Sequence, residues 1–409
     1  MINPQPPATP ALVELKDPPV LDIDPFSDEV LRDPYPFHDV LRESAPVVWL
    51  ERHGIYAVGR YNEIGEVLQD HTRFTAAGGV GMSDIRKPGA WRSPSPISEI
   101  DPPEHTGVRA ALTKVISPLV IRKWRDDFQQ EADRVASQVV EREFVDGVRD
   151  IAEAFVLHVF PKALGIKIPK ENFIAIGDMN FNQLGPNNER LQQSMERVKP
   201  IMAWYEESFQ RHRALPGGFA EQIFLAEEAG EFKAGTAPAQ VRSFLRAGVD
   251  TTMAGIGHTL HHLARNPDQW AIVRADPTKV RAAFEEALRF ESPSQTMFRT
   301  TVEDTQLSGY RLQGDKKVAM FFGAGNRDPR KWDEPNTYTI NRVTAGIHLS
   351  FGGGVHICVG QMIARMEAET ILGAIAKRVR NLELAGEPVV RLVNTLRTLD
   401  HLPLKITAA

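Results

Sequence analysis

Apolar residues recur with helical spacing along most of the chain. The segment 61–70 places Ile64, Val67 and Leu68 on one face of a helix. Similar patterns predict further helices over 118–145, 152–165, 238–266, 277–290 and 361–379. Pro161 is expected to break or kink the helix over 152–165. The pattern therefore predicts a mainly helical protein.

Short runs of β-forming residues are the minor part of the pattern. Residues 47–51 and 55–60 flank the tripeptide Arg52-His53-Gly54 and predict a β-hairpin. The runs 298–302 and 316–322 predict two more strands. An irregular stretch follows over 325–350, and irregular chain of that length inside a compact domain usually has a function. No sharp change in composition marks a linker, so we expect one domain over residues 21–409.

The first 20 residues differ from the rest of the chain. They contain prolines at positions 4, 6, 7, 10, 18 and 19, which block regular structure and predict a mobile leader over 1–20. This segment has neither the basic nor the apolar region of a signal peptide. No run of about 18 apolar residues follows, so we expect no contact with a membrane.

Bulk composition narrows the class of protein. Hydrophobic residues make up 42% of the chain and charged residues 25%, which is ordinary for a globular protein. The net charge of -5 argues against a nucleic-acid partner. The single cysteine excludes an internal disulfide and favours a reducing compartment, so we expect the protein in the cytoplasm.

Glycines interrupt the predicted helix over 238–266. Gly248, Gly255 and Gly257 each cost about 1 kcal/mol relative to alanine in a helix interior. We therefore expect close packing or a bound group against this helix.

The single cysteine, Cys358, lies just before the predicted helix 361–379 and among the glycines 352, 353, 354 and 360. A helix N-terminus stabilises a thiolate, and glycines let a bulky planar group approach, so the pattern favours a metal-ligating thiolate. Alternatively, Cys358 is simply a small buried hydrophobic residue with no chemical role. A third interpretation is a nucleophilic cysteine, which would need a histidine as its base. His356 is only two residues away in a turn, where it is poorly placed to abstract the proton. The glycines do not form a phosphate-binding loop, because both nucleotide-binding patterns are absent.

Four motifs in the chain together resemble those of the cytochrome P450 family. They are F-x-x-G-x-x-x-C-x-G (351–360), E-x-x-R (286–289), A-G-x-D-T-T (247–252) and D-P-P-x-H-x-x-x-R (101–109). The resemblance covers about residues 20–409. It implies a mainly α fold with a minor β part, in which haem b lies between a long distal helix and a proximal cysteine loop.

The resemblance also implies roles for individual residues. Asp250 would relay protons and Thr251 would donate a hydrogen bond to dioxygen, a reaction that needs proton delivery without free access of water. The structural pair would be Glu286 and Arg289, with Arg342 as a third partner. Cys358 would ligate the haem iron. The candidates for binding the haem propionates are His105, Arg109, Arg299 and His356. Gly107 stands where the family usually has an arginine.

Electrons would come from a ferredoxin and its reductase. Arg122, Lys123 and Arg125 form a candidate docking patch for an acidic ferredoxin, or simply a solvated helix face. A peroxide-using enzyme of the same fold, or a monooxygenase for another small organic substrate, is the alternative. The presence of both Asp250 and Thr251 argues against the peroxide-using enzyme.

Several segments resemble bacterial P450s that oxidise para-substituted benzoates such as 4-methoxybenzoate. These segments are WRSPS, NFNQLGPNNE, VRSFLRAGVDTT and FESPSQTMFRTT. The resemblance implies O-demethylation or hydroxylation of an aromatic carboxylic acid. The implied acid-binding residues are Arg92, Ser95, Arg242 and Ser243. The implied ring-binding residues are Phe181, Leu184, Ala247, Met297 and Leu396.

The chain departs from those enzymes at two of these positions and at one further position on the same predicted helix as Ser243. Leu184 and Met297 replace phenylalanines, and Arg246 replaces a small residue, so the ring slot is expected to be wider or more cationic. Arg246 would either face the pocket or pair with Asp250 as an i, i+4 salt bridge.

Overall fold

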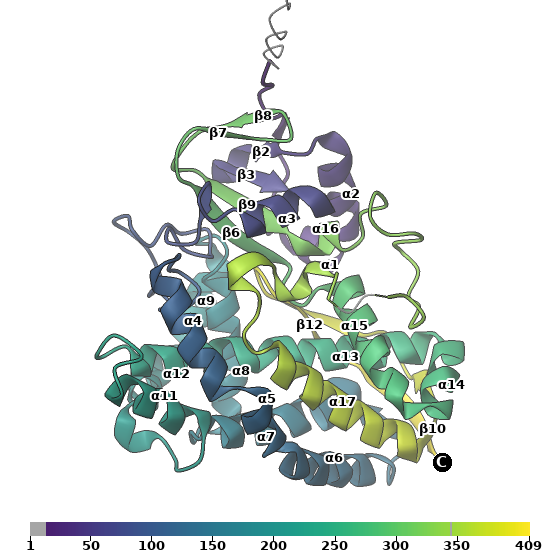
Figure 1. Cartoon of the computed structure of the whole chain (residues 1–409). Helices are drawn as coiled ribbons and strands as arrows, with labels where there is room; N and C mark the ends of the chain where they lie inside the picture. The colour runs from purple at the N-terminus through teal and green to yellow at the C-terminus, as the bar shows by residue number, and fades with distance from the viewer. Residues whose placement is uncertain (1–13, 344–345) are drawn as a thin grey trace, which may run out of the picture.

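The computed structural model describes residues 14–343 and 346–409. A β-rich part lies at the top of Figure 1 and a larger helical part lies below it, and the predicted predominance of helix is confirmed. The helices before the distal region are α1 (Asp28–Arg32), α2 (Tyr35–Ser44), α3 (Tyr61–Gln69), α4 (Glu104–Val115), α5 (Pro118–Arg122), α6 (Arg125–Val139), α7 (Ala154–Leu164), α8 (Lys170–Asn182), α9 (Glu189–Val198), α10 (Met202–Glu207) and α11 (Phe219–Glu228). The later helices are α12 (Ala237–Gly248), α13 (Asp250–Arg265), α14 (Pro267–Ala275), α15 (Val280–Glu291), α16 (Phe322–Gly325) and α17 (Gln361–Arg378).

The main sheet has six strands in the order β1-β2-β3-β9-β6-β4. These strands are β1 (Val20–Leu21), β2 (Val48–Leu50), β3 (Ile55–Val58), β4 (Phe74–Thr75), β6 (Thr296–Thr301) and β9 (Lys317–Phe321). The predicted hairpin is confirmed, since β2 pairs with β3 in antiparallel register. Three smaller sheets contain β5 (Phe144–Asp146), β7 (Thr305–Leu307), β8 (Tyr310–Leu312), β10 (Val379–Leu384), β11 (Val389–Leu392), β12 (Arg397–His401) and β13 (Pro403–Ala408).

Both faces of the main sheet are covered. Successive side chains of a strand point to opposite faces. In β9, Val318 and Met320 accordingly enter one apolar cluster, while Ala319 and Phe321 enter another. This burial on both faces explains why β9 appears in the sequence as a continuous apolar run.

Three helix predictions need correction. The segment 118–145 is not one helix, because it divides into α5 and α6 and its last residues belong to β5. Pro161 lies inside α7 and does not end it, and the helix continues to Leu164. The segment 238–266 forms α12 and α13, which are separated at Val249.

The glycines in this segment serve close packing, as expected. A Cβ atom on Gly248 would lie 2.2 Å from the ring of Phe160, and one on Gly255 would lie 2.7 Å from the ring of Phe284. Real side chains do not approach this closely, so α12 and α13 can pack against these rings only where they have no side chain. The third glycine, Gly257, has only an ordinary contact at 3.8 Å.

The expected leader lies partly outside the described residues, which begin at 14. Within the described part, Lys16 forms a β-bridge with Tyr310, and Val20 pairs with Trp49 of β2. The main sheet thus includes residue 20, which the sequence interpretation assigned to the leader. Among the described residues, no helix is both long enough and apolar enough to cross a membrane.

Candidate active site

A cavity of about 330 Å³ lies between α12 and α13 on one side and the cysteine loop, residues 349–360, on the other. In Figure 1 this loop leads into α17 near the middle of the molecule, in front of α13. The residues that line the cavity include Thr251 from α13 and Cys358 from the loop. The tertiary fold therefore brings together two motifs that are more than 100 residues apart.

The loop around Cys358 is held by its backbone. The amide of Cys358 donates to the carbonyl of Phe351 at 2.8 Å. Gly354 has φ of +62°, and a Cβ atom there would lie 2.3 Å from the carbonyl oxygen of Leu68. Only glycine fits this position, because a side chain would be strained and would collide with fixed backbone.

The surroundings of the Cys358 sulfur have opposing effects on its charge. Burial raises the pKa of the thiol, while the N–H groups of Gly360 and Gln361 and the guanidinium groups of Arg109 and Arg365 favour the thiolate. A metal ion at the sulfur would decide the balance, because a coordinating thiol is deprotonated outright.

The four predicted propionate-binding residues all line the cavity. His356 Nε2 lies 3.2 Å from Asp101 Oδ1, and the rings of His356 and His105 are 4.3 Å apart between centroids. Arg109 donates to the carbonyl of Ile357 at 2.5 Å. These contacts fix the side chains at one end of the cavity.

Two of these residues have unused hydrogen-bonding capacity. His105 Nε2 is buried without a partner among the described residues, and burial lowers the pKa of this imidazole to about 4. Arg299 is 4% exposed and, within the part of the chain that the structure describes, donates only to the carbonyl of Phe298; burial lowers its pKa to about 10. Arg299 is a buried cation that requires an anionic partner, and neutral His105 can donate an N–H, so these residues fit the carboxylates of a haem.

The residues of the A-G-x-D-T-T motif (247–252) point in two directions, some toward the cavity and some toward the protein interior. Thr251 lines the cavity, and its hydroxyl donates to the carbonyl of Ala247 at 2.7 Å. The hydroxyl of Thr252 donates in the same way to Gly248, at 3.1 Å. Such bonds compete with the helical ladder and are consistent with the break at Val249.

Asp250 faces away from the cavity, toward α8. A Cβ atom on Gly177 would lie 2.2 Å from Asp250 Oδ1, so only glycine leaves room for this carboxylate. Arg391 lies 3.5 Å from both Asp250 and Asp178, and Asp178 pairs at 2.8 Å with Arg197. This row of charged side chains extends from the buried Asp250 to the surface, where the Arg197 side chain is 53% exposed.

Burial raises the pKa of Asp250 to about 7, with Asp178 and Glu153 adding to the effect and Arg391 opposing it. An acid with this pKa can both accept and release a proton near neutral pH. The possible pairing of Asp250 with Arg246 is wrong, since Arg391 is the partner and Arg246 lines the cavity.

Most of the predicted substrate residues line the same cavity. These are Arg92, Ser95, Phe181, Leu184, Ser243, Ala247 and Met297. Arg242 does not line it, and instead pairs with Glu206 at 3.5 Å. Leu396 also lies outside the lining, where it packs behind Phe181 and Leu184.

Two acidic residues at the cavity were not predicted. Glu99 forms an ion pair with Arg92 in which both side chains are almost fully buried. Glu367 on α17 is fully buried, lines the cavity and has no hydrogen-bond partner for either carboxylate oxygen among the described residues. Burial raises the pKa of Glu367 well above its ordinary value, with a smaller opposing effect of Thr252. No pattern in the sequence distinguishes these acids from solvated ones.

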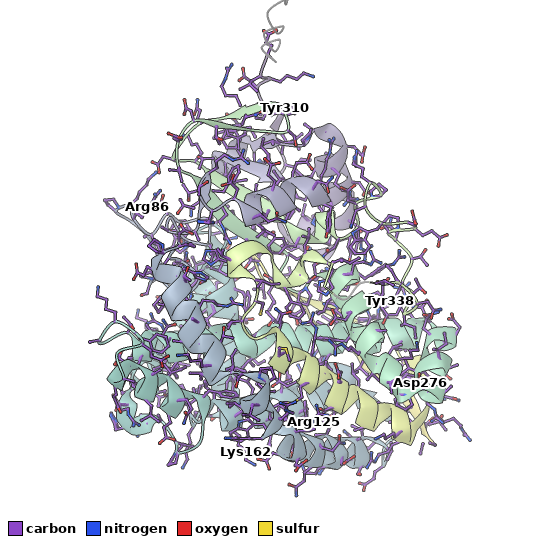
Figure 2. The ribbon with its side chains drawn as sticks, viewed as in Figure 1. Arg86, Arg125, Lys162, Asp276, Tyr310 and Tyr338 are labelled. Carbon is purple, nitrogen blue, oxygen red and sulfur yellow. The ribbon has the colours of Figure 1, made fainter. Side chains whose placement is uncertain are left out.

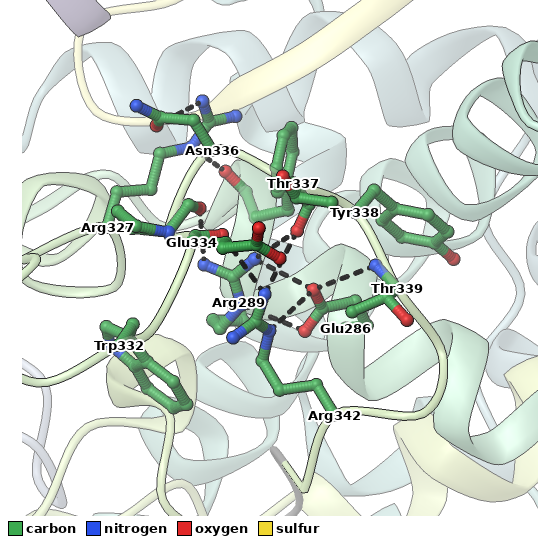
Figure 3. Close-up of polar contacts among 12 residues, drawn as sticks. Glu286, Arg289, Arg327, Trp332, Glu334, Asn336, Thr337, Tyr338, Thr339 and Arg342 are labelled. Atoms are coloured by element: carbon green, nitrogen blue, oxygen red, sulfur yellow. Dashed lines mark hydrogen bonds and ion pairs between the residues drawn. The ribbon is translucent and has the colours of Figure 1, made fainter.

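The Glu286–Arg289 pair lies beside the segment that leads to the cysteine loop. Both side chains are fully buried and 2.8 Å apart. Arg342 is the third member, 3.1 Å from Glu286. Figure 3 shows these side chains converging beneath the segment 334–339, where Arg289 donates to the carbonyls of Pro335 and Thr337.

Comparisons with known proteins agree with this geometry. The family model described as Cytochrome P450 matches residues 191–386. Cytochrome p450 CYP199A2 from Rhodopseudomonas palustris is 47% identical over 393 residues, which cover 96% of this chain and 95% of that protein. Putative cytochrome P450 123 from Mycobacterium tuberculosis is 28% identical, over 95% of this chain and 98% of that protein. The solved structure of Cytochrome P450 CYP109Q5 from Chondromyces apiculatus has a TM-score of 0.79 and 28% identity, covering 95% of this chain and 99% of that one.

Proposed function

This chain belongs to the cytochrome P450 family and is a monooxygenase, and we propose that its substrate is a small aromatic carboxylic acid. The proposed reaction is O-demethylation or hydroxylation of a para-substituted benzoate. One oxygen atom of O2 enters the substrate and the other leaves as water, with two electrons and two protons supplied from outside the site.

Family membership implies a haem-thiolate cofactor, and we propose that it is haem b. Cys358 would bind the iron, and His105, Arg109, Arg299 and His356 would bind the propionates. When bound, the haem supplies the activation of dioxygen. The protein's own contribution is to orient the substrate, to limit the entry of water and to deliver protons.

Asp250 and Thr251 are proposed to deliver protons. Asp250 contacts Arg391, which also contacts Asp178, and its pKa of about 7 lets its carboxyl accept and release a proton near neutral pH. The Thr251 hydroxyl lies in the cavity wall and can turn from the Ala247 carbonyl to a partner in the cavity. Burial favours the protonated form of the Glu367 carboxyl, because it raises the pKa of this group well above its ordinary value.

Charge and shape at the distal part of the cavity support an acidic aromatic substrate. Among the described residues that line the cavity, the acids are Glu99 and Glu367. Glu99 pairs with Arg92, and burial favours the neutral form of Glu367, which leaves an excess of positive charge at Arg246. This excess is the observation on which the proposal chiefly rests, because a cation in an apolar wall attracts an anionic ligand. Phe181, Leu184 and Met297 provide apolar surface for a ring.

We propose that a ferredoxin and its reductase supply the electrons. We also propose that the protein is located in the cytoplasm. Arg122, Lys123 and Arg125 are exposed, and none forms an ion pair with another described residue. Arg125 begins α6, beside α17 (Figure 2). Cations on the side of Cys358 would attract an acidic electron donor. Exposed apolar side chains that would complement such an interface are Leu119, Ile357 and Met362.

The test is binding and turnover with a panel of para-substituted benzoates and their neutral amides. With NADH, a ferredoxin and its reductase, 4-methoxybenzoate should yield 4-hydroxybenzoate and formaldehyde. A peroxide-driven reaction without these donors would instead favour the peroxygenase alternative. The substrate proposal would be contradicted by a panel in which no acid binds, or in which the amides bind as tightly as the acids.

A further inference from the structure

The three arginines near the distal part of the cavity differ in their partners. Arg92 is neutralised by Glu99, and Glu99 is itself fixed by the amides of Val80 at 2.9 Å and Ser95 at 2.7 Å. The Nε–H of Arg92 has no partner but is buried out of contact with solvent. Arg242 lies outside the cavity lining and pairs with Glu206. Neither of these arginines presents an unneutralised charge to a ligand.

The hydroxyl pair in the predicted acid-binding group has no free proton in this arrangement. Ser243 Oγ donates to the carbonyl of Ala239 at 2.9 Å. Ser95 Oγ lies 3.1 Å from Ser243 Oγ and donates to it, because the single proton of Ser243 is already used. A carboxylate only accepts hydrogen bonds, so it would gain a donor from this pair only by breaking one of these two bonds.

Arg246 is the exception. It lines the cavity, is half-buried, and forms no hydrogen bond or ion pair within residues 14–343 and 346–409. The charged and titratable groups that influence it are Tyr205, Arg242, Arg92 and Glu99. Since Glu99 is paired with Arg92, no acidic side chain in the described part of the chain pairs with Arg246. A buried cation without a partner is costly, and an anionic ligand removes this cost.

We propose that Arg246, and not Arg92 or Arg242, binds the carboxylate of the substrate. This inference rests on the proposed function and identifies the residue that selects for the acid. Arg246 lies three residues nearer to Thr251 than Ser243 does, about 4.5 Å along a helix axis. The acid is therefore held closer to the reacting end of the cavity than the Ser95–Ser243 pair would hold it. Leu184 and Met297 then bound the ring.

The experiment compares the dissociation constants of 4-methoxybenzoate and 4-methoxybenzamide, measured by calorimetry and by the shift of the haem absorption band. The preference for the acid is the ratio of the two constants. Arg246→Gln should lower this ratio about 10- to 100-fold, the effect of losing a charged hydrogen bond. Arg246→Lys should retain most of the ratio, because it keeps the charge. Arg246→Gln should also fold, since it removes an unpaired buried charge.

Two further variants test the competing residues. Arg242→Gln should leave the ratio within about threefold, which is less than one hydrogen bond is worth. The double variant Arg92→Gln/Glu99→Gln removes the ion pair without leaving a lone charge, and should also keep the ratio. An unchanged ratio in Arg246→Gln, or a ratio lost in either competing variant, would overturn the assignment to Arg246. A wild-type protein with no preference for the acid would overturn the proposed substrate class as well.

Discussion

The buried pair of Glu286 and Arg289 offers the sharpest test of how the fold holds the cysteine loop. In the variant Arg289→Ala, Glu286 would lose its main cationic partner inside the protein. Breaking a buried ion pair by removing one member costs about 3–5 kcal/mol. Glu286 keeps Arg342 at 3.1 Å and the amide of Thr339 at 3.3 Å, which favours the lower part of this range.

The backbone carbonyls around Arg289 add to the loss. Arg289 donates to Asn326 at 2.8 Å, to Pro335 at 2.9 Å and to Thr337 at 3.3 Å. Alanine replaces none of these donors, and a buried carbonyl left unpaired costs about 1–3 kcal/mol unless water reaches it. We therefore expect Arg289→Ala to lower the free energy of unfolding by at least about 3 kcal/mol.

The same helix provides a matched control. Arg281 on α15 pairs with Glu369 at 3.5 Å, but the two side chains are 56% and 37% exposed. A surface pair of this kind contributes about 0–1 kcal/mol, so Arg281→Ala should be nearly neutral. Urea unfolding of the haem-loaded proteins, followed by circular dichroism, gives both free energies. Loss of the thiolate–haem spectrum with carbon monoxide should accompany unfolding of Arg289→Ala at lower urea. If the two variants differed by less than about 1 kcal/mol, the structural role assigned to the pair would be refuted.

Three further predictions concern the site. Burial raises the pKa of Asp250 from 3.8 to about 7, so the folded chain retains this proton to higher pH than the unfolded chain, and the contribution of Asp250 to the free energy of unfolding falls as pH rises between these values. Asp250→Asn should remove this decrease, and urea midpoints at pH 5 and pH 8 that change equally in both proteins would contradict it. Thr251→Ala should lower the product formed per NADH consumed, with recovery in Thr251→Ser, and equal yields in all three proteins would exclude a role for the hydroxyl. Cys358→Ser should abolish the thiolate-type absorption of the reduced protein with carbon monoxide, and an unchanged spectrum would disprove ligation by this sulfur.

Local rules let the sequence by itself predict a mainly helical fold and a glycine-rich loop at Cys358 just before a helix. Helical periodicity predicts α3 and α15, because one face of each helix must be apolar to pack on the core. The pairing of Glu286 with Arg289 follows from their separation by three residues on one helix. The glycines around Cys358 predict a loop with positive φ angles, and Gly354 indeed has a φ of +62°, which other residues rarely adopt.

Only the tertiary structure decided how charges are distributed at the site. The partner of Asp250 is Arg391, 141 residues away on a strand, and no local pattern relates the two. Whether Arg92, Arg242 or Arg246 is free to bind an anion depends on the positions of Glu99 and Glu206, which packing between separate segments determines. The sequence shows that a charged side chain is present, but its availability to a ligand depends on which opposite charge the folded chain buries beside it.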